Sequence, residues 1–385
     1  MARLKSTPKS TKTKTAGRVE TAAVPAEALE GEFPRLGLPI EPPYPPMEAR
    51  QAERIPDGEG WLYEPKWDGF RCLAFRKGDT VALQSKSGQP LDRYFPELVA
   101  AFGALPLRAF VLDGEIVIRN EEGLDFDALL QRIHPAESRI RKLARETPAI
   151  FYAFDLLVDS REKAVAGLPL KERRQGLEKL FGKISGNKTP GEGSVILSPA
   201  TSDHALAERW LRELGAGGLD GVVAKLADSP YLSGERDAMV KVKRIRTADC
   251  VVGGFRWAQK GGKNEGKIGS LLLGLYNRDG LLDHVGFSSS FTAEEKSGLE
   301  AVLLPLREPP GFTGKAPGGP SRWAQGRSTE WEPLRPALVC EVRYDHFSGG
   351  RFRHGTKFLR WRPEKKPEQC TFEQVRPAGA RSPTS

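Results

Sequence analysis

The stretch EPKWDGFR, residues 64–71, places a lysine beside groups that could make it reactive. Lys66 is preceded by Glu64 and followed by Asp68, Gly69 and Arg71. A lysine amine is a nucleophile only when neutral, and at its usual pKa of about 10.4 only about one in a thousand is neutral at pH 7. Desolvation, neighbouring positive charge or a metal must therefore activate it. The same cations would bind a phosphate, although on spacing alone the stretch is also compatible with surface decoration.

Four later stretches place ionisable or aromatic side chains on otherwise apolar predicted strands. These are LDGEIVI with Asp113 and Glu115, YAFDLL with Phe154 and Asp155, LDGVVAK with Asp220 and Lys225, and MVKVKR with Lys241 and Lys243. Residues two apart on a strand point to the same face. Charges among apolar neighbours are costly unless they are paired, bound to metal or bonded to a ligand. Each stretch alone could be a solvated strand end, but together they predict a phosphate and metal pocket built on strand ends.

The elements that would carry these residues divide the chain in two. From about residue 60 to 246 short strands rich in branched and aromatic residues mix with helices, without regular βαβ alternation, which favours an α+β fold. The expected strands are WLYEPKW, GFRCLAFR, VALQSK, FVLDGEIVI and AIFYAFDLLV, and the expected helices are DFDALLQRIH, LKERRQGLEKLF and SDHALAERWLRELGAG. A proline cluster at 39–46 should run extended over the surface.

The pattern changes near residues 244–249. Five strand-like stretches follow, DCVVGGFRW, GSLLLGLYN, LLDHVGFSSS, LVCEVRYDHF and KFLRWRP, with one clear helix, TAEEKSGLEAVLLPL. This combination predicts a small β-barrel of the oligonucleotide-binding (OB) type. The expected division is a disordered basic tail over 1–31, a first domain over 32–246, the barrel over 247–375 and a disordered tail over 376–385.

Composition bounds the class of protein. The net charge of +9 raises the chance of a polyanionic partner, nucleic acid above all. Part of it comes from residues 1–19, which hold six Lys or Arg and no acid; such a segment is either a solubilising tail or a non-specific arm on nucleic-acid phosphates. The four cysteines form no Cys-x-x-Cys pair, so a cysteine zinc site is not expected. There is no membrane-length apolar run and no signal peptide, which predicts a cytoplasmic protein.

The motifs, taken in order, resemble those of the covalent nucleotidyltransferases, which comprise DNA ligases, RNA ligases and mRNA capping enzymes. EPKWDGFR resembles motif I, QSKSG motif Ia, LDGEI motif III, FYAFDLL motif IIIa, LDGVVAK motif IV, MVKVKR motif V and RHGTKFLRWRPEKK motif VI. Stretches such as GLDFDALLQRIHPA and EVRYDHFSGGRFRH are most similar to the bacterial C-type ATP-dependent DNA ligases (LigC), with the LigD ligase domain a near relative. The resemblance covers about residues 40–375. It implies an adenylation (nucleotidyltransferase, ATP-grasp-like) domain followed by an OB-fold domain.

The resemblance implies a three-step reaction in which Lys66 takes AMP from ATP, passes it to the 5′-phosphate at a nick in duplex DNA, and a 3′-hydroxyl then displaces AMP. It implies that Glu64 reads the adenine amino group and that Phe154 stacks on the adenine. Arg71 and Glu115 would hold the ribose and neighbouring groups.

The phosphate side of the site is implied in the same way. Lys225, Lys241 and Lys243 would bind the AMP phosphate, and their charge would lower the pKa of Lys66, with Asp68 close to the lysine. Glu115 and Asp220 would place Mg²⁺ or Mn²⁺. The pyrophosphate would be oriented by the motif VI cations, Arg360, Arg362 and Lys365, which requires the barrel to close over ATP and later to swing away to hold DNA.

Three residues depart from the family pattern. Lys86, expected to contact DNA phosphate, stands where motif Ia often has arginine, so the charge is kept without the bidentate contact. Asp220 is one carbon shorter than the glutamate that often begins motif IV, which makes direct metal contact an open question. Met239 stands where motif V often has tryptophan.

Two other classes of function are compatible with parts of this pattern. One is an RNA ligase or a GTP-using capping enzyme with the same covalent lysine; Glu64 and the C-type barrel sequence favour ATP and nicked DNA instead. The other is a non-catalytic nucleic-acid-binding module, in which the lysines act only by charge. The expected protein is a monomeric DNA-repair enzyme associated with the bacterial nucleoid, with a repair polymerase as a possible partner.

Overall fold

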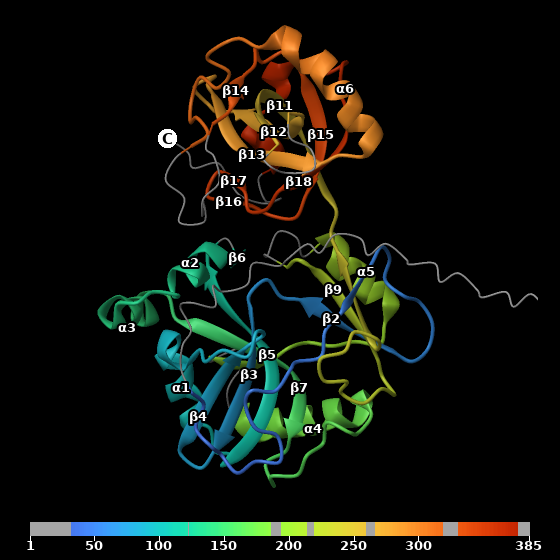
Figure 1. The fold of residues 1–385 in the computed structure, drawn as a ribbon. Helices are drawn as coiled ribbons and strands as arrows, with labels where there is room; N and C mark the ends of the chain where they lie inside the picture. The colour runs from blue at the N-terminus through green and yellow to red at the C-terminus, as the bar shows by residue number, and fades with distance from the viewer. Residues whose placement is uncertain are drawn as a thin grey trace, which may run out of the picture.

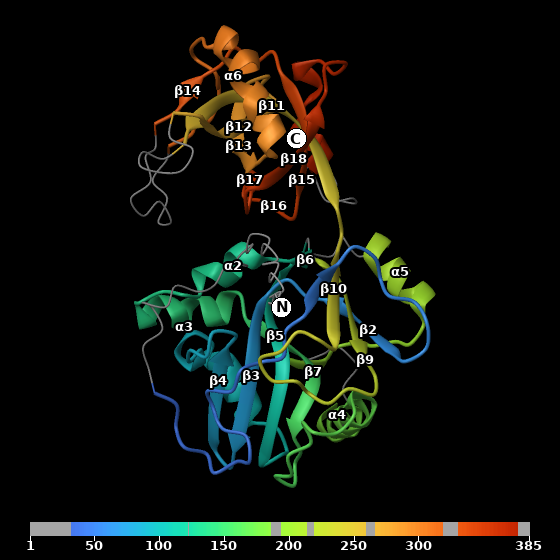
Figure 2. The same ribbon diagram turned by 45° about the vertical axis from the view of Figure 1, so that its right-hand side comes forward.

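The computed structural model describes residues 32–121, 123–185, 194–213, 219–258, 266–318 and 330–375. These form two bodies, one on each side of a link at residues 244–245 (Figure 1; Figure 2). The expected tails at 1–31 and 376–385 lie outside the described residues. None of the described helices combines the length and the apolar character that a membrane crossing requires.

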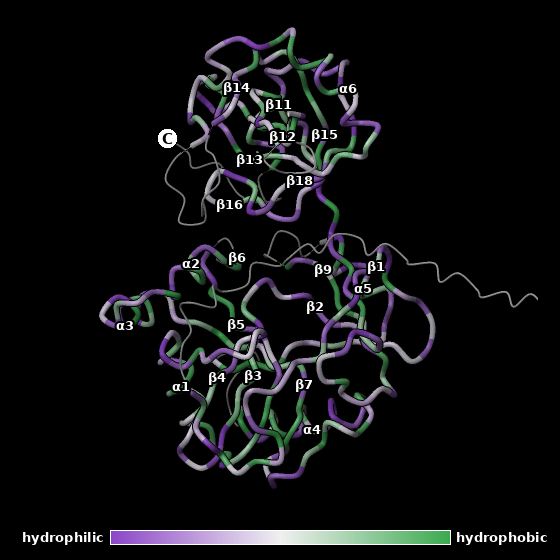
Figure 3. The backbone as a smooth tube through the Cα atoms, in the orientation of Figure 1, coloured by the Kyte–Doolittle hydropathy of each residue, from purple (hydrophilic) through white to green (hydrophobic). Residues whose placement is uncertain are grey.

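The first domain is organised around a six-stranded sheet in the order β4-β3-β5-β7-β8, with β6 pairing to β5. The strands are β3 (Phe70–Lys77), β4 (Thr80–Ser85), β5 (Ala109–Asn120), β6 (Gly123–Leu124), β7 (Ala149–Val158) and β8 (Val195–Leu197). The central strands are hydrophobic along most of their length because both faces of the sheet are covered (Figure 3). These central strands therefore form a rigid support for the side chains of the candidate site described below.

A second, four-stranded sheet in the order β1-β10-β9-β2 lies beside the first. Its strands are β1 (Arg50–Ala52), β2 (Trp61–Lys66), β9 (Gly221–Leu226) and β10 (Met239–Lys243). The register pairs Lys66 with Gly221 and Gly221 with Lys243, so three strands meet where β2 ends. Because side chains alternate along strands, the residues at positions 64, 66, 225, 241 and 243 all occupy one face of this sheet.

Five helices complete the first domain: α1 (Pro96–Gly103), α2 (Phe126–Gln131), α3 (Glu137–Glu146), α4 (Leu170–Ser185) and α5 (His204–Glu213). α4 packs on β7, and α5 packs on β2 and β9. α2 begins at an aspartate cap, since Asp125 accepts the N–H of Ala128 at 2.8 Å. The buried ion pair between Asp155 of β7 and Arg173 of α4, with contacts of 2.8 and 2.9 Å, ties the helix to the sheet.

The second domain is a closed barrel. Its strands run in the order β12-β13-β18-β15-β11-β14, and β11 pairs back to β12, which closes the ring. The elements are β11 (Arg246–Trp257), β12 (Ile268–Tyr276), β13 (Leu282–Ser290), α6 (Ala293–Leu303), β14 (Glu332–Pro333), β15 (Val339–Tyr344) and β18 (Thr356–Trp361). A two-stranded hairpin, β16 (Phe347–Ser348) with β17 (Arg351–Phe352), lies at the barrel edge that faces the first domain (Figure 1).

The sequence expectations locate most of these elements. The expected α+β class and the expected barrel of the OB type are confirmed, and all of the strands and helices named from the sequence are found. The sequence does not predict the short strands β1, β6, β8, β14, β16 and β17 or the helices α1 and α3. α3 is strongly charged, with Ile140 its buried residue, so it carries little of the apolar periodicity that identifies a helix.

The close approach of β9 to β10 depends on Gly221. Its φ of +155° is rarely adopted by other residues, and a Cβ there would lie 2.0 Å from the carbonyl oxygen of Val242. We expect Gly221→Ala to lower the free energy of unfolding by roughly 3 kcal/mol or more, since backbone atoms cannot move aside cheaply. Thermal and urea unfolding measure this. Gly167→Ala is the matched control, because nothing lies within 4 Å of its Cβ position; equal effects of the two substitutions would contradict this account.

Candidate active site

The lysine of motif I lies at the end of β2, against the carboxylate that precedes β9. Lys66 Nζ lies 2.5 Å from Asp220 Oδ2, and the backbone N–H of Asp220 donates to the carbonyl oxygen of Lys66 at 3.0 Å. Burial lowers the pKa of Lys66, but the charge of Asp220 outweighs this and leaves the pKa above its usual value. The expectation that neighbouring lysines depress this pKa is therefore not met in this arrangement, because the carboxylate is closer.

The other lysines of the sheet face the same region. Burial lowers the pKa of Lys241, and repulsion from Lys66, Lys86 and Lys243 adds to this. Lys243 Nζ lies 2.9 Å from Asp345 Oδ2 and 3.6 Å from Asp220 Oδ2. The structure thus brings together the lysine cluster inferred from the sequence. The positive charge of this cluster lowers the pKa of Lys241.

Asp220 is the centre of this charged cluster. Besides Lys66, it receives His346 of the barrel domain, whose Nε2 lies 2.7 Å from Asp220 Oδ1. Burial alone would raise the pKa of Asp220, but the cations Lys66 and Lys243 and the bond from His346 hold that pKa well below its usual range. The carboxylate is therefore ionised, and the histidine N–H donates to it.

The aspartate of motif I also contacts the barrel domain. Arg353 Nη1 donates to both oxygens of Asp68, at 2.8 and 3.1 Å, while its guanidinium lies 4.0 Å from the centroid of the Phe126 ring. Gly69, next in the motif, allows the close backbone approach expected from the sequence, since a Cβ there would lie 2.2 Å from the carbonyl oxygen of Ile116.

The adenine-side residues lie between the two sheets. Glu64 is 2% exposed, and Lys225 Nζ forms an ion pair with its Oε2 at 2.8 Å. Burial raises the pKa of Glu64, although Lys225 partly offsets this. The other oxygen, Glu64 Oε1, is buried without a hydrogen-bond partner among the described residues. A buried acceptor without a donor is costly, so it can accept the amino group of a bound base.

The aromatic residue expected to stack on adenine is covered by cations. Lys225 Nζ and the Arg71 guanidinium each lie 4.5 Å from the centroid of the Phe154 ring. The cavity beside them, lined partly by Arg71 and Lys225, holds about 10 Å³. The polar groups present suit a nucleotide, but these side chains must leave the ring before a base can stack there.

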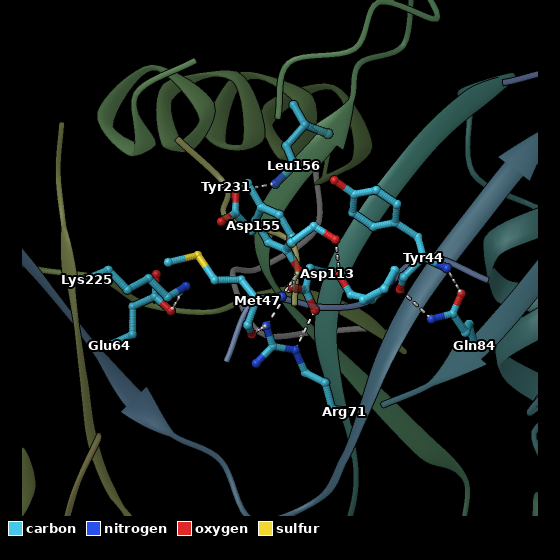
Figure 4. A network of polar contacts seen from close by, with 12 residues as sticks. Tyr44, Met47, Glu64, Arg71, Gln84, Asp113, Asp155, Leu156, Lys225 and Tyr231 are labelled. Atoms are coloured by element: carbon cyan, nitrogen blue, oxygen red, sulfur yellow. Dashed lines mark hydrogen bonds and ion pairs between the residues drawn. The ribbon is translucent and has the colours of Figure 1, made fainter. Parts of the chain in front are cut away.

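A hydrogen-bonded network holds Arg71 in place (Figure 4). Arg71 makes two bonds of 2.6 Å to the fully buried Asp113, and the Tyr231 hydroxyl donates to the same carboxylate at 2.6 Å. The hydroxyl oxygen accepts the N–H of Met47 at 2.9 Å. The network joins β3 and β5 to the loop before β1 and the segment before β10, and so fixes the two sheets relative to one another.

Two carboxylates that could hold a divalent cation, Asp68 and Asp220, lie close together beside a histidine. Asp68, Asp220 and His346 each bring a ligand-type atom within 4.8 Å of the others, and in the described part of the chain this group does not include Glu115. Carboxylate oxygens suit Mg²⁺ or Mn²⁺. Both oxygens of Asp220 already accept hydrogen bonds in this arrangement. Asp220 and Glu115, the two residues expected to hold the metal ion, are therefore of a suitable ligand type. The structure does not bring them together as a pair.

The motif VI cations are not at this site. Arg360 pairs with Glu341 at 2.8 Å, and Lys365 pairs with Asp249 at 2.6 Å. Arg362 lies 2.8 Å from Asp249 and 2.5 Å from Glu364. These partners belong to the barrel domain itself. Lys86 of motif Ia lies 3.3 Å from Glu48 and is 46% exposed, which leaves it open to solvent.

Comparison with known proteins decides the family. Residues 46–243 match the family model described as ATP dependent DNA ligase domain, and residues 264–365 match the ATP dependent DNA ligase C terminal region. DNA ligase C1 of Mycolicibacterium smegmatis is 46% identical over 350 residues, covering 88% of this chain and 96% of that protein. The chain belongs to the ATP-dependent DNA ligases. DNA ligase C of Mycobacterium tuberculosis is 46% identical over 353 residues, with the same coverage.

More distant ligases share parts of the chain or its fold. The multifunctional non-homologous end joining protein LigD of Mycobacterium bovis is 33% identical over 322 residues, which cover 81% of this chain and 37% of that protein. A solved structure of a Lig E DNA ligase has 17% identity and a TM-score of 0.52, and the match covers 83% of this chain and 99% of that one. The latter similarity concerns the fold alone.

Sequence reasoning for this ligase missed the residues that join the domains and support Arg71. Asp345 and His346 lie within EVRYDHFSGGRFRH, and Arg353 is both in this stretch and the first residue of the motif VI stretch, but nothing in these patterns indicates contact with β2 or β9. Tyr231 follows a Ser-Pro dipeptide between the stretches LDGVVAK and MVKVKR. Their roles depend on distant partners, which local spacing does not reveal.

Glu115 gives this ligase a pH-dependent stability. Burial raises the pKa of Glu115 to about 7, although Arg71 and Lys66 partly offset the rise. A carboxyl group with a raised folded-state pKa contributes stability below its unfolded pKa of about 4.3 and loses it as pH rises through the folded value. Without nucleotide or divalent ion, we expect the parent to lose up to ~3 kcal/mol relative to Glu115→Gln between pH 4.5 and 8.

Urea unfolding at several pH values measures this difference. The control is Glu137→Gln, which removes a 70% exposed carboxylate of α3; its profile should run parallel to that of the parent. A constant difference between the parent and Glu115→Gln across this pH range would contradict the assignment.

Proposed function

We propose that Lys66 is the residue that carries AMP in this ATP-dependent DNA ligase. The observation that supports this most directly is its position: it ends β2 on the one sheet face that also carries Glu64, Lys225, Lys241 and Lys243. That face looks onto the Phe154 ring of the other sheet. A nucleotide bound there would have its base near Glu64 and its phosphate among the lysines.

In the first step the neutral amine of Lys66 attacks the α-phosphorus of ATP. An N–P bond forms, the bond from that phosphorus to the bridging oxygen breaks, and pyrophosphate leaves with the electron pair. Lys66 must first give up the proton that its ion pair with Asp220 retains. We propose that Lys225, Lys241 and Lys243 stabilise the charge that develops on the phosphate.

In the second step the 5′-phosphate of a nicked DNA strand attacks the AMP phosphorus, and the N–P bond to Lys66 breaks. The third step forms the phosphodiester bond when the 3′-hydroxyl attacks the activated phosphate and AMP leaves. A bound Mg²⁺ or Mn²⁺ would neutralise phosphate charge, and Asp220 and Glu115 are the carboxylates proposed to hold it. Asp68 and Arg71 would position the lysine and the ribose.

The remaining assignments extend the same proposal. Motif VI residues Arg360, Arg362 and Lys365 would reach the pyrophosphate only after leaving their barrel-domain partners. Lys86 would contact a DNA phosphate. We place the domain boundaries at 32–246 and 247–375. We also propose that the protein is a cytoplasmic, nucleoid-associated monomer that serves DNA repair, with a repair polymerase as a possible partner.

The covalent step is tested by incubation with ATP labelled at the α-phosphate and a divalent ion. We expect the parent to retain label that acid releases and base does not, as a phosphoramidate should, and mass spectrometry to place one AMP on Lys66. Lys66→Ala should lose labelling by roughly 10³-fold or more, as removal of a nucleophile does. Lys142→Ala, at a 66% exposed position of α3, is the control. Label retained by the Lys66 variant would reject the assignment.

Substrate class is tested with three matched nicked duplexes: all-DNA, DNA with a 3′-ribonucleotide at the nick, and all-RNA. We expect rapid sealing of the all-DNA nick with ATP and none with GTP. The reason is that the buried carboxylate of Glu64 can accept a hydrogen bond from the amino group of adenine. An RNA ligase would favour the all-RNA nick, and a capping-type enzyme would become labelled by GTP. Preferred sealing of the all-RNA nick would favour the RNA ligase, and labelling by GTP would favour the capping-type enzyme, over a ligase that acts on nicked DNA.

A further inference from the structure

A turn of the barrel domain lies directly on the active site. Residues 344–347, here called the YDHF turn, connect β15 to β16 and bring Asp345 and His346 to Lys243 and Asp220. We propose that His346 is a positioning residue for the steps that follow adenylation of the enzyme, and that it acts by holding Asp220 and the barrel domain in this arrangement. The proposal rests on the assignment of Lys66 as the residue that carries AMP.

The first argument is that the two carboxylate oxygens of Asp220 accept hydrogen bonds from two different donors. Its Oδ2 accepts Lys66 at 2.5 Å, and its Oδ1 accepts His346 at 2.7 Å. The carboxylate is 7% exposed, and His346 is 12% exposed, so solvent cannot readily replace either donor. Lys66 belongs to the first domain and His346 to the barrel domain. The interactions of this carboxylate therefore depend both on the charge of Lys66 and on the position of the barrel.

The second argument follows from the chemistry of Lys66. When its nitrogen is bonded to phosphorus, the ammonium charge that pairs with Asp220 is gone. A buried carboxylate that loses its partner is strongly disfavoured unless another donor remains. Among the described contacts, the remaining donors are His346 and Lys243, and Lys243 is itself held by Asp345 of the YDHF turn at 2.9 Å. Adenylation should therefore increase the preference for a docked barrel.

The third argument is which face of the barrel is docked. The YDHF turn and Arg353 contact the site, whereas Arg360, Arg362 and Lys365 pair with carboxylates of their own domain. In this arrangement Lys66 is capped by Asp220 and the motif VI cations do not reach it. The arrangement therefore does not suit attack on ATP, and it does leave the motif VI face away from the site. We assign it to the later steps.

The test separates the steps with one preparation of full-length protein. The formation of lysyl-AMP from labelled ATP is measured without DNA. Sealing is measured in a single turnover without free ATP, in which enzyme that already carries AMP is mixed with a nicked duplex that has a 5′-phosphate. For His346→Ala we expect lysyl-AMP formation at the parental rate or faster. We expect sealing by the adenylated enzyme to fall by roughly 10- to 100-fold, the cost of losing one hydrogen bond to a charged group.

Two further variants sharpen the result. His346→Gln keeps an N–H donor and should restore part of the sealing rate. His134→Ala removes a histidine whose described bond is local, to the N–H of Ala136, and should match the parent in both assays. Normal lysyl-AMP formation by His346→Ala also shows that the variant is folded.

The proposal is overturned if adenylated His346→Ala seals the nick as fast as the adenylated parent, whatever its rate of lysyl-AMP formation. It is equally overturned if both rates fall in parallel, or if His346→Gln is as defective as His346→Ala. A failure of the nucleophile assignment is seen separately, because Lys66→Ala would then still become labelled.

Discussion

The need to neutralise one buried carboxylate organises this active site. Asp220 stands where β2, β9 and β10 meet, and its charge is tolerated only because Lys66, Lys243 and His346 surround it. The same carboxylate keeps the proton on Lys66. Under the proposed assignment, activation of Lys66 and any movement of the barrel domain would be linked through this carboxylate, since the loss of one donor to Asp220 changes its interaction with the others.

The residues proposed to bind the nucleotide are in place, but their side chains leave too little room for it. Arg71 and Lys225 cover the Phe154 ring, the adjoining cavity is about 10 Å³, and Glu64 keeps one buried oxygen without a described partner. Binding of ATP would exchange these internal contacts for contacts to the base and phosphates. The Arg71–Asp113–Tyr231 network limits how far the sheets can separate, so side-chain movement rather than rearrangement of strands is the simplest opening.

In the proposed reaction the barrel domain would present two different faces to one site. The barrel is closed by the pairing of β11 with β12 and joined to the first domain by the short link after β10, so we propose that it moves as one body. One face carries the YDHF turn and Arg353, and motif VI carries a second group of cations. A single domain can in this way contribute different charges at different steps, as in other enzymes whose domains close over a substrate.

The class of fold, most strands and the charged residues that share one face of the β1-β10-β9-β2 sheet follow from the sequence. The reason is that strand alternation is local: the spacing of Glu64 from Lys66 and of Lys241 from Lys243 already places each pair on one face. Only the tertiary structure decided that the Lys66 pKa is raised, that Asp220 accepts a histidine from the barrel, and that the motif VI cations lie elsewhere. Those outcomes depend on distances between residues up to 154 positions apart, and electrostatic energies in a buried site change steeply with distance.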